Sequence, residues 1–352
     1  MELNKDLNVA IINHKLFLQT LYGNTKEIDN LLQTFDIKTP FRMDLEAEKV
    51  AINLELGSTS KKKKKRKLSA EDEILQAEKV FLQKKLTEAR QLVETHFPGS
   101  PSLTEIRENN RNTRQQVKLL LESLREREGR NIPKSGRNGD EDSCEKDGVL
   151  FPPLSEYIKL DISELSTFCK DLGQFDIILL DPPWENKHVK RHKYGADGYD
   201  MLGNEDLLNI PVGKFLREDG IVLVWTTNNR RHRDAVDEML RRWEVVKLTT
   251  WFWVKLTTYG ELVCDFSHSK QPYEVCIVGQ SRKSREKLDV GKKVVIMSVP
   301  CAIQSHKPPL DHILEALTGK GWKGMRKLEI FGRNLSPGWV TVGNQPYFLN
   351  LI

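Results

Sequence analysis

The chain has 352 residues, 38% of them hydrophobic and 30% charged, and carries a formal net charge of +5. Such a length can bury a core in one or two domains, and the polar composition indicates solvated segments beside the folded part. No apolar run is long enough to cross a bilayer, and the first residues lack the features of a secretory signal. We therefore expect a soluble intracellular protein without membrane contacts.

Cysteine and histidine are too widely spaced to predict a disulfide framework or a metal site. No C-x-x-C pair occurs among the five cysteines, which are Cys144, Cys169, Cys264, Cys276 and Cys301. His268 and His306 lack partners at the spacing of metal ligands. We therefore expect reduced thiols and no bound metal.

Residues 1–60 are predicted to form a small N-terminal region in which the apolar runs Val9–Ile12 and Leu16–Leu21 are short strands or a hairpin. Residues 61–68 follow as a basic linker, because the seven consecutive positive charges of Lys61–Lys67 cannot be buried. This run is typical of a nuclear localisation signal or a phosphate-binding arm, and a plain solvated linker is the alternative. We expect a nuclear location, with the cytoplasm as a second one.

Residues 69–127 are predicted to form an antiparallel helical hairpin. Apolar residues recur at helical spacing over residues 75–93, and the Pro98-Gly99 pair ends the first helix. A second helix is expected over residues 103–125. Residues 128–149 are rich in glycine, asparagine, lysine and aspartate, so we expect a disordered linker there.

A main domain is predicted over residues 150–352, where buried strands alternate with helices. This alternation favours an α/β sheet covered on both faces, and ligands bind such sheets at the carboxyl ends of strands. The predicted strands are Phe175–Leu180, Ile221–Thr226, Val245–Leu256, Tyr273–Val278, Val294–Val299, Lys327–Phe331 and Trp339–Val342. The predicted helices are Glu205–Leu216, Arg231–Trp243 and Leu310–Leu317.

The tetrapeptide Asp181-Pro182-Pro183-Trp184 ends the first of these buried strands. An adenine amine is a poor nucleophile because its lone pair is delocalised into the ring, and acceptors for both of its hydrogens favour a localised lone pair. Asp181 supplies a side-chain acceptor, and Pro182 supplies a main-chain carbonyl. Trp184 offers a ring for stacking on an extruded base. These four residues are the candidate catalytic residues, and a plain turn is the alternative interpretation.

The chain resembles the MT-A70-like adenine N6-methyltransferase family in four motifs. After the D-P-P-W tetrapeptide, Ser305-His306-Lys307-Pro308 matches the family's S-H-K-P, Glu329-Ile330-Phe331-Gly332-Arg333 resembles its E-L-F-G-R, and Gly343-Asn344-Gln345 matches its G-N-Q. Order and spacing agree over roughly residues 155–347. The stretch Asp181–Lys193 is most similar to the branch called methyltransferase-like protein 4.

The resemblance implies a Rossmann-like class I methyltransferase sheet with a mainly helical N-terminal region before it. The sheet would be circularly permuted, because Phe331-Gly332 takes the place of the usual glycine-rich turn and comes after the catalytic motif. The implied cofactor is S-adenosylmethionine.

The resemblance also implies which residues hold this cofactor. Asp181 would contact both the amino end of the cofactor and the target amine, Lys307 would pair with the cofactor carboxylate, and Asp161 and Ile162 would hold its adenine. The segment 334–338 is shorter than in familiar family members, so Asn334 or Ser336 would replace the usual ribose contacts. The full implied set comprises Asp161, Ile162, Asp181, His306, Lys307, Glu329, Phe331, Arg333, Asn334, Ser336, Asn344 and Gln345.

The loop after the tetrapeptide is basic and contains Gly195 and Gly198, which suits phosphate binding and closure over a substrate. An ordinary solvated loop is the alternative. The candidate substrate-binding residues are Trp184, Asn186, Lys187, Lys190, Arg191, Lys193, Tyr194 and Tyr199. A second basic group, for which RNA contact and a solvated helix face are equally open, comprises Arg230, Arg231, Arg233, Arg241 and Arg242.

Three functional hypotheses follow. The resemblance implies a methyltransferase acting on adenosine in RNA, with 2′-O-methyladenosine in small nuclear RNA as the expected target. DNA adenine methylation by the same chemistry is the alternative, because the sequence leaves the sugar contacts unassigned. A non-catalytic nucleic-acid-binding subunit ranks lower, since Asp181, Trp184 and Lys307 are all present. We expect activity as a monomer, with a partner protein left open.

Overall fold

The computed structural model describes residues 1–23, 26–41, 70–184, 203–266, 271–303, 306–319, 321 and 324–352. The basic run 61–67 and the loop 185–202 lie outside the described residues, so the predictions made for them keep that status. In the described part of the chain, no helix is both long and apolar enough to span a membrane. The described thiols of Cys144, Cys264, Cys276 and Cys301 are not in disulfide bonds.

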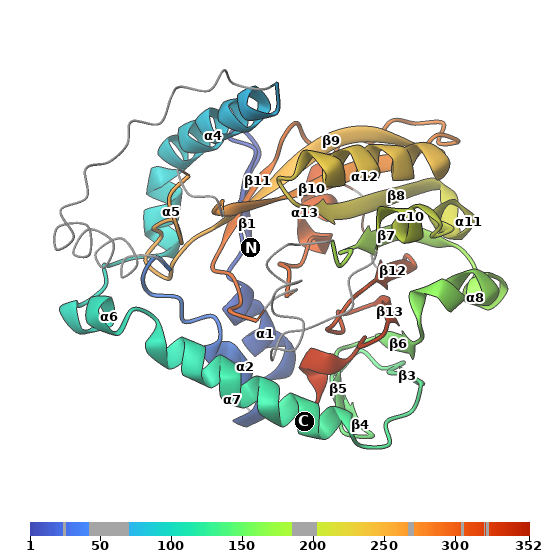
Figure 1. Cartoon of the computed structure of the whole chain (residues 1–352), viewed down its shortest axis with the longest axis horizontal. Coiled ribbons are helices and arrows are strands. Elements are labelled where there is room, and N and C mark those ends of the chain that lie inside the picture. The colour runs from blue at the N-terminus through green and yellow to red at the C-terminus, as the bar shows by residue number, and fades with distance from the viewer. Residues whose placement is uncertain are drawn as a thin grey trace, which may run out of the picture.

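A mixed sheet forms the centre of the molecule (Figure 1). In spatial order its described strands are β1 (Glu2–Asn4), β2 (Val9–Ile11), β11 (Val295–Ser298), β9 (Val245–Lys255), β10 (Tyr273–Ser281), β8 (Leu216–Thr226), β7 (Phe175–Leu180), β12 (Lys327–Ile330), β13 (Trp339–Gly343), β6 (Glu156–Lys159) and β3 (Ser135–Arg137). The strands β8, β7, β12, β13 and β6 run parallel to one another, whereas β10 is antiparallel to both of its neighbours. The predicted α/β sheet is therefore confirmed.

The order of the parallel strands shows the circular permutation. The strand β12, which precedes the Phe331-Gly332 turn, lies beside β7, whose end carries the Asp181 tetrapeptide. Ile330 pairs with Leu180 in this register. In the chain, however, β12 begins 147 positions after β7 ends, so the turn and the Asp181 tetrapeptide meet only in the folded sheet.

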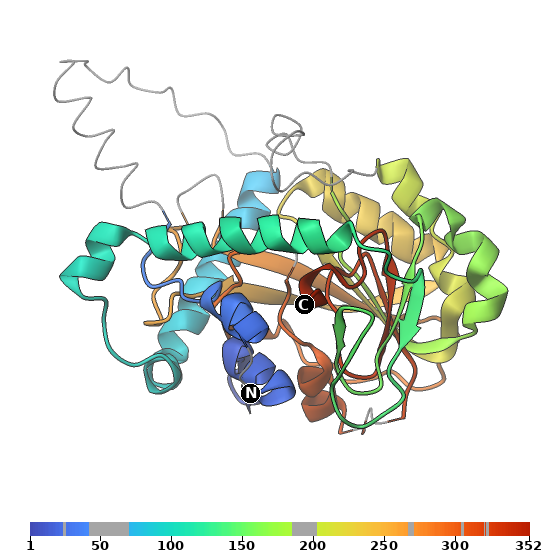
Figure 2. The same ribbon diagram turned by 90° about the horizontal axis from the view of Figure 1, so that it is seen from below.

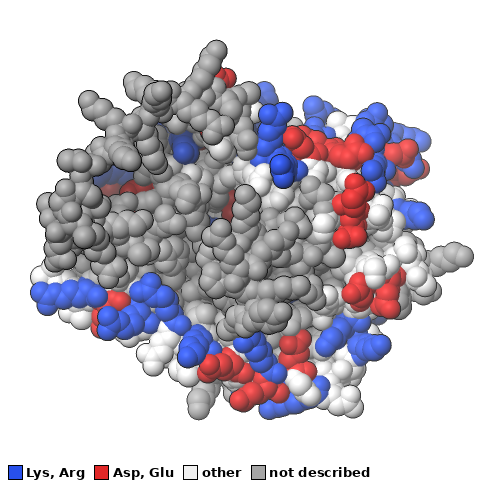
Figure 3. Space-filling model, viewed as in Figure 1, with Lys and Arg blue, Asp and Glu red and all other residues white. Residues whose placement is uncertain are grey.

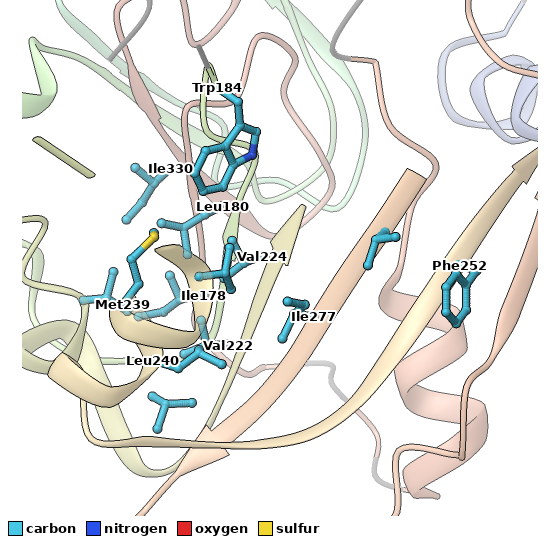
Figure 4. Packing of buried hydrophobic residues seen from close by; sticks show 14 of the residues in the cluster. Ile178, Leu180, Trp184, Val222, Val224, Met239, Leu240, Phe252, Ile277 and Ile330 are labelled. Carbon is cyan, nitrogen blue, oxygen red and sulfur yellow. The ribbon is translucent and has the colours of Figure 1, made fainter. Parts of the chain in front are cut away.

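Alternating side chains of β7 enter two different cores, because neighbouring residues of a strand point to opposite faces. Ile178 and Leu180 pack with Met239 of helix α12 (Arg230–Arg242), as Figure 4 shows. Ile177 packs on the other face, in the same cluster as Ile313 of helix α13 (Asp311–Thr318). The shorter helix α8 (Leu165–Leu172) joins β6 to β7 and contributes Leu165 to the first core. Both faces of the central strands are thus covered.

The helix predicted over Glu205–Leu216 is wrong in its extent. The structure has two short helices, α10 (Asn204–Leu208) and α11 (Val212–Phe215), and Leu216 already begins β8. The break falls at Ile210-Pro211, because proline cannot donate the backbone hydrogen bond that a continuing helix requires.

The N-terminal region contains helices where a second strand was expected. Val9–Ile11 is a strand as predicted, but Leu16–Leu21 lies inside helix α1 (His14–Tyr22), which is followed by α2 (Lys26–Gln33). The side chain of Asn13 caps α1 by accepting a hydrogen bond of 2.9 Å from the Leu16 backbone N–H. The periodicity of a short apolar run fits both a helix and a strand, and here the Asn13 cap favours the helix.

The predicted hairpin over residues 69–127 is also wrong. The segment forms four helices, α4 (Ala70–Glu88), α5 (Arg90–His96), α6 (Leu103–Glu108) and α7 (Arg111–Glu128). In Figure 1, α4 and α7 lie on different sides of the molecule. Their apolar stripes have different partners: α4 places Phe81 against Phe252 of β9, at 5.7 Å between ring centroids, whereas α7 buries Leu124 in the cluster of Phe348.

The predicted disordered linker over residues 128–149 is wrong as well. It contains β3, which extends the main sheet beyond β6, and β4 (Cys144–Lys146), which pairs with β5 (Val149–Phe151). Polar edge strands carry little apolar signal, so composition alone misplaced them. β3 packs closely against β6 at Gly136, because a Cβ there would lie 2.6 Å from the ring of Tyr157.

Candidate active site

The candidate site lies where the parallel strands end. Asp181 directly follows β7, and its backbone N–H donates to the carbonyl of Ile330 on β12 at 3.4 Å. The loops after β6, β12, β13 and β8 leave the same edge of the sheet, because these strands are parallel. The structure therefore brings Asp161, Asp181, Phe331 and Asn344 to a common edge, as the motifs predict.

A chain of alternating charges holds the Asp181 carboxylate. Lys307 donates from Nζ to Asp181 Oδ2 at 2.8 Å, and the same Nζ lies 3.4 Å from Glu274 Oε2. Lys255 in turn donates to Glu274 Oε1. Glu274 stands near the start of β10 and Lys255 ends β9, so neighbouring strands carry the chain of charges. The side chains of Asp181 and Lys307 are only 12% and 14% exposed, which makes their pairing stronger than that of a surface ion pair.

These contacts shift the pKa values of the three groups. Burial raises the pKa of Asp181, the Lys307 ammonium opposes this, and Glu274 adds to the rise. For Glu274, burial would raise the pKa, but the ammonium groups of Lys255 and Lys307 lower it to about 2. The pKa of Lys307 lies above its usual value, because Asp181 and Glu274 outweigh the effect of burial. Glu274 and Lys307 are therefore ionised at neutral pH.

Trp184 is buried, contrary to the expectation that its ring is open for a base. The side chain is 6% exposed, its Nε1 donates to the Trp225 carbonyl at 3.0 Å, and its ring stacks on His232 at 4.9 Å and 18°. His232 is fixed by a 2.7 Å hydrogen bond between its Nδ1 and the Thr227 hydroxyl. The Trp184 ring thus forms part of the packed layer beneath Asp181 and joins the core of Figure 4.

The main chain of the tetrapeptide is arranged as an acceptor. The Pro182 carbonyl accepts from the Trp184 N–H at 2.8 Å, and a carbonyl oxygen has a second lone pair for another donor. Asp181 Oδ2 is taken by Lys307, and Oδ1 has no partner among the described residues. Two acceptors for an amine therefore lie in adjacent residues.

The turn after β12 is compact. Phe331 has a φ of +72°, a left-handed conformation that glycine usually occupies, and its N–H donates to the Val342 carbonyl at 2.9 Å. Gly332 leaves no space for a side chain, because a Cβ would lie 2.4 Å from Cγ2 of Thr341. Glu329 lies at the base of the turn, and burial raises its pKa to about 8, with Asp181 adding to the effect. Such retained strain is common at ligand sites.

The residues implied for the adenine end lie on two neighbouring loops. Asp161 caps a short 3-10 helix over Ile162–Glu164 by accepting from the Ser163 N–H at 2.9 Å and from its hydroxyl at 2.6 Å. These interactions with Ser163 lower the pKa of Asp161. Ile162 is 9% exposed. Asn344 is exposed on the adjacent loop, so an acid, an apolar side chain and an amide lie together at this edge.

Gln345 and the residues after β12 also contact protein groups. The Gln345 Nε2 donates to both carboxylate oxygens of Glu128, at 3.0 and 2.9 Å. The Arg333 guanidinium lies 4.6 Å from the centroid of the Phe348 ring. Asn334 donates to the Ser336 hydroxyl at 3.4 Å. These contacts fix the loop segments, and the cofactor roles implied for the four residues stay predictions.

His306 is turned away from the charged chain and into the N-terminal region. Its ring packs against His14 at 4.7 Å and against Phe35 at 5.6 Å. Burial lowers the pKa of His306 to about 4, with the Lys307 ammonium adding to the effect, so the ring is neutral at pH 7. Its implied cofactor role has no support in this placement. No group of three or more potential metal ligands occurs among the described residues.

The two predicted basic groups have different outcomes. Asn186, Lys187, Lys190, Arg191, Lys193, Tyr194 and Tyr199 lie outside the described residues. On α12, four of the five arginines have acidic partners. Arg230 pairs with Asp234, Arg241 and Arg242 pair with Glu238, and Arg233 forms two hydrogen bonds, of 2.6 and 2.9 Å, with Glu78 of α4. Figure 3 shows the blue and red side chains intermingled over α12. This placement favours the solvated and structural interpretation of α12 over RNA contact.

Sequence reasoning missed four residues around the site. Glu274 and Lys255 extend the chain of charges, His14 supports His306, and Glu128 binds Gln345. None belongs to a motif, and each comes from an element that only the fold brings near the site. The one available signal was the position of Lys255 and Glu274 at strand ends.

The sheet order, with the candidate catalytic tetrapeptide at the end of a central parallel strand, defines a Rossmann-like methyltransferase fold. The MT-A70 family model matches residues 175–345, so this part of the chain is similar to the MT-A70 family. The match confirms the family resemblance that the motifs indicate.

Curated relatives are similar over a little more than half of the chain. The N(6)-adenine-specific methyltransferase METTL4 of Mus musculus is 35% identical over 207 residues, which are 56% of this chain and 42% of the relative. The DNA N6-methyl methyltransferase of Caenorhabditis elegans is 34% identical over 209 residues, 58% of this chain and 55% of the relative. The N6-methyladenosine RNA methyltransferase MTA1 of Pyricularia oryzae is 32% identical over 212 residues, which are 56% of this chain and 54% of the relative. The matches thus span about half the length of these relatives.

Proposed function

We propose that this chain is an S-adenosylmethionine-dependent methyltransferase that methylates the exocyclic N6 amine of adenine in a nucleic acid. The observation that carries the proposal is the Asp181 carboxylate, buried at the end of β7 and held by Lys307 with one oxygen left as an acceptor. The names of the relatives, which describe N6-adenine methylation, support the same chemistry.

The site suits an amine that must be made nucleophilic. Asp181 Oδ1 and the Pro182 carbonyl accept the two amine hydrogens, which favours a pyramidal nitrogen. The bound cofactor would supply the methyl group to this nitrogen, and one proton would leave the nitrogen. The raised pKa of Asp181 suits a group that receives this proton. The main contribution of the protein is alignment in a site with little water.

The residues present fit S-adenosylmethionine by the chemistry of their donors and acceptors. This cofactor supplies an activated methyl group on a cationic sulfur. Lys307 keeps a third ammonium hydrogen beside the two that face Asp181 and Glu274, so it can bind the cofactor carboxylate. At the other end of the edge, Asp161 offers an exposed carboxylate and Asn344 an exposed amide for the adenine, above the buried side chain of Ile162. The carboxylates of Asp181 and Glu274 beside Lys307 suit the cationic part of the cofactor.

For the polymer, we propose RNA, with 2′-O-methyladenosine in small nuclear RNA as the target. The motif resemblance to the methyltransferase-like protein 4 branch and a relative named as an RNA methyltransferase support this choice, and the basic run 61–67 supports a nuclear location. DNA is the second candidate, because a relative of similar identity is named as a DNA methyltransferase. A non-catalytic nucleic-acid-binding subunit ranks third, because Asp181 and Lys307 form the pair that the chemistry requires. We propose that the chain acts as a monomer.

The test uses purified protein and cofactor labelled in the methyl group. Matched RNA and DNA oligonucleotides, each with or without 2′-O-methyl on the target adenosine, are assayed for N6-methyladenine by mass spectrometry. Highest turnover on 2′-O-methylated RNA supports the full proposal, and highest turnover on DNA moves the assignment to the second candidate. Absence of methyl transfer to every adenine substrate refutes the enzyme assignment.

Replacing Asp181 tests the residue that carries the proposal. Asp181→Asn preserves size but loses the charge facing Lys307 and one acceptor, so we expect kcat to fall by a factor of about 10² to 10⁴. Binding of S-adenosylhomocysteine, followed by calorimetry, checks that the site is still formed. The matched control is Asp234→Asn on the exposed side of α12, which should leave kcat unchanged. Wild-type turnover by Asp181→Asn would refute the role of the carboxylate.

A further inference from the structure

The last turn of α7 reaches the edge of the sheet where the cofactor would lie. Glu128 is the final residue of α7, and its two carboxylate oxygens both accept from Gln345 Nε2, at 3.0 and 2.9 Å. Gln345 follows Asn344 in the loop after β13. The contact joins a helix outside the matched segment 175–345 to a residue at its end.

The position of α7 is fixed independently of this contact. Leu121 and Leu124 are buried in a cluster that includes Phe348. Arg127, one residue before Glu128, donates to the Leu351 carbonyl at 3.0 Å. Figures 1 and 2 both place the C-terminal segment beside the end of α7. Glu128 is therefore presented by a rigid element, and its contact with Gln345 is not a chance encounter of two mobile side chains.

A carboxylate allows only one orientation of the Gln345 amide. A glutamine amide has an NH₂ donor and a carbonyl acceptor of almost the same shape, whereas an ionised carboxylate only accepts hydrogen bonds. With Nε2 turned to Glu128, the carbonyl Oε1 must face the other way. Flipping the amide would remove two charge-assisted hydrogen bonds and bring a carbonyl oxygen against a carboxylate. Glu128 thus converts an ambiguous amide into a fixed acceptor.

The edge of the sheet beside Gln345 is suited to a purine. The loop after β6 lies next to the loop after β13, because Gly343 pairs with Lys159 and the Gly343 carbonyl accepts from the Leu160 N–H at 3.0 Å. Ligands of α/β sheets bind at such carboxyl ends. Adenine carries a hydrogen-bond donor, its exocyclic amine, whereas hypoxanthine carries a carbonyl acceptor at the same position. An oriented Oε1 would accept a hydrogen bond from the adenine amine and repel the hypoxanthine carbonyl.

We propose that Glu128 is a positioning residue of the cofactor site, which orients the Gln345 amide so that the site selects the adenine of S-adenosylmethionine over a 6-oxopurine. This inference rests on the proposed function, because it requires that the cofactor binds at this edge. It adds a role for α7, a helix that the family match does not cover.

The experiment measures binding, not turnover. Dissociation constants of S-adenosylhomocysteine and of S-inosylhomocysteine are determined by calorimetry for the wild type and for Glu128→Gln. For the wild type we expect the inosyl compound to bind at least tenfold more weakly, roughly the effect of one lost hydrogen bond plus an unpaired buried acceptor. In Glu128→Gln, residue 128 can donate as well as accept, so the Gln345 amide can flip and the ratio should fall to about threefold or less.

Two further variants make the result specific. Glu126→Gln is the matched control, because Glu126 is exposed on the same turn of α7, and its ratio should equal that of the wild type. In a Gln345→Met background there is no amide to orient, so adding Glu128→Gln should leave the ratio unchanged. A thermal unfolding curve for each variant confirms that it is folded.

Each outcome has a defined meaning. A wild-type ratio near one, or an unchanged ratio in Glu128→Gln, overturns the role of Glu128. A further loss of selectivity in the Gln345→Met background would also overturn it, because Glu128 would then act by another route. If the wild type binds neither compound, the proposed function itself fails at the cofactor, which this assay separates from a failure that concerns Glu128 alone.

Discussion

The turn between β12 and β13 allows a sharp test of how tightly this edge is packed. Gly332→Ala would place a methyl group 2.4 Å from Cγ2 of Thr341 and 3.0 Å from Cδ of Glu329. Ordinary contacts between carbon atoms are about 3.5–4.0 Å, so the neighbours must move by about 1 Å. Gly332 does not have a left-handed φ, so the substitution acts through packing and not through backbone strain.

The expected magnitude follows from the burial of the neighbour. Thr341 is fully buried on β13, directly opposite Glu329 in the parallel register, so it has little space into which to move. Overpacking of this kind lowers the free energy of unfolding by about 1–3 kcal/mol. Because the turn lies beside Asp181 through the contact with Ile330, we also expect weaker binding of S-adenosylhomocysteine.

A second substitution should relieve the clash. Thr341→Ser removes Cγ2 but keeps the hydroxyl, and alone it should cost about 1 kcal/mol through the lost methyl group. In the double variant the new alanine methyl occupies the vacated space, so the two effects should not add, with a coupling free energy of about 1–2 kcal/mol. The assay is thermal or urea unfolding of all four proteins under one set of conditions. Simple additivity, or a Gly332→Ala variant as stable as the wild type, would refute the packing argument.

Two further predictions concern buried ionisable groups. The pKa of Glu329 is raised to about 8 by burial and by Asp181. The contribution of this group to stability is therefore present below the ordinary pKa of a glutamate and is lost as the pH rises through 8. Glu329→Gln should flatten the decline of the unfolding temperature between pH 6 and 9, and an unchanged decline would contradict the assignment. Arg233→Met leaves the Glu78 carboxylate without its bidentate partner at 14% exposure, so we expect a loss of about 2–4 kcal/mol and faster hydrogen exchange in α4. Adding Glu78→Met should recover part of that loss, and a further loss instead would show that the pair is not the cause.

Local patterns predicted the centre of the domain well. The run Phe175–Leu180 is β7, and Asp181 follows it at the carboxyl edge, as expected for a buried strand that ends in a turn. The strand before Phe331 and the final strand from Trp339 were also confirmed, because continuous apolar runs between turn residues carry a strong signal. The order of the motifs was enough to predict the circular permutation.

Contacts between distant segments were beyond the reach of such patterns. The sequence predicts that Lys307 binds a carboxylate, but not that Asp181 and Glu274 are among its partners, because nothing local links three residues on separate loops and strands. The same holds for Trp184, whose aromatic character suggested an open stacking surface until the fold placed His232 against it. The polar segment Ser135–Arg137 is a strand because it pairs with β6, and its own composition does not indicate a strand.

The placement of β2 has a consequence for how the chain folds during synthesis. Residues 9–11 pair with residues 295–297 of β11 in a parallel register, so the ribosome has made almost all of the domain before these strands can meet. Contacts so far apart in sequence close slowly, and a nascent strand that waits for its partner exposes unpaired backbone groups. In a protein shortened to residues 150–352, β2 would be missing, and β11 would become an edge strand with unpaired backbone groups. We therefore expect the N-terminal segment to be a late but necessary part of the sheet, and a truncated domain to aggregate where the full chain does not.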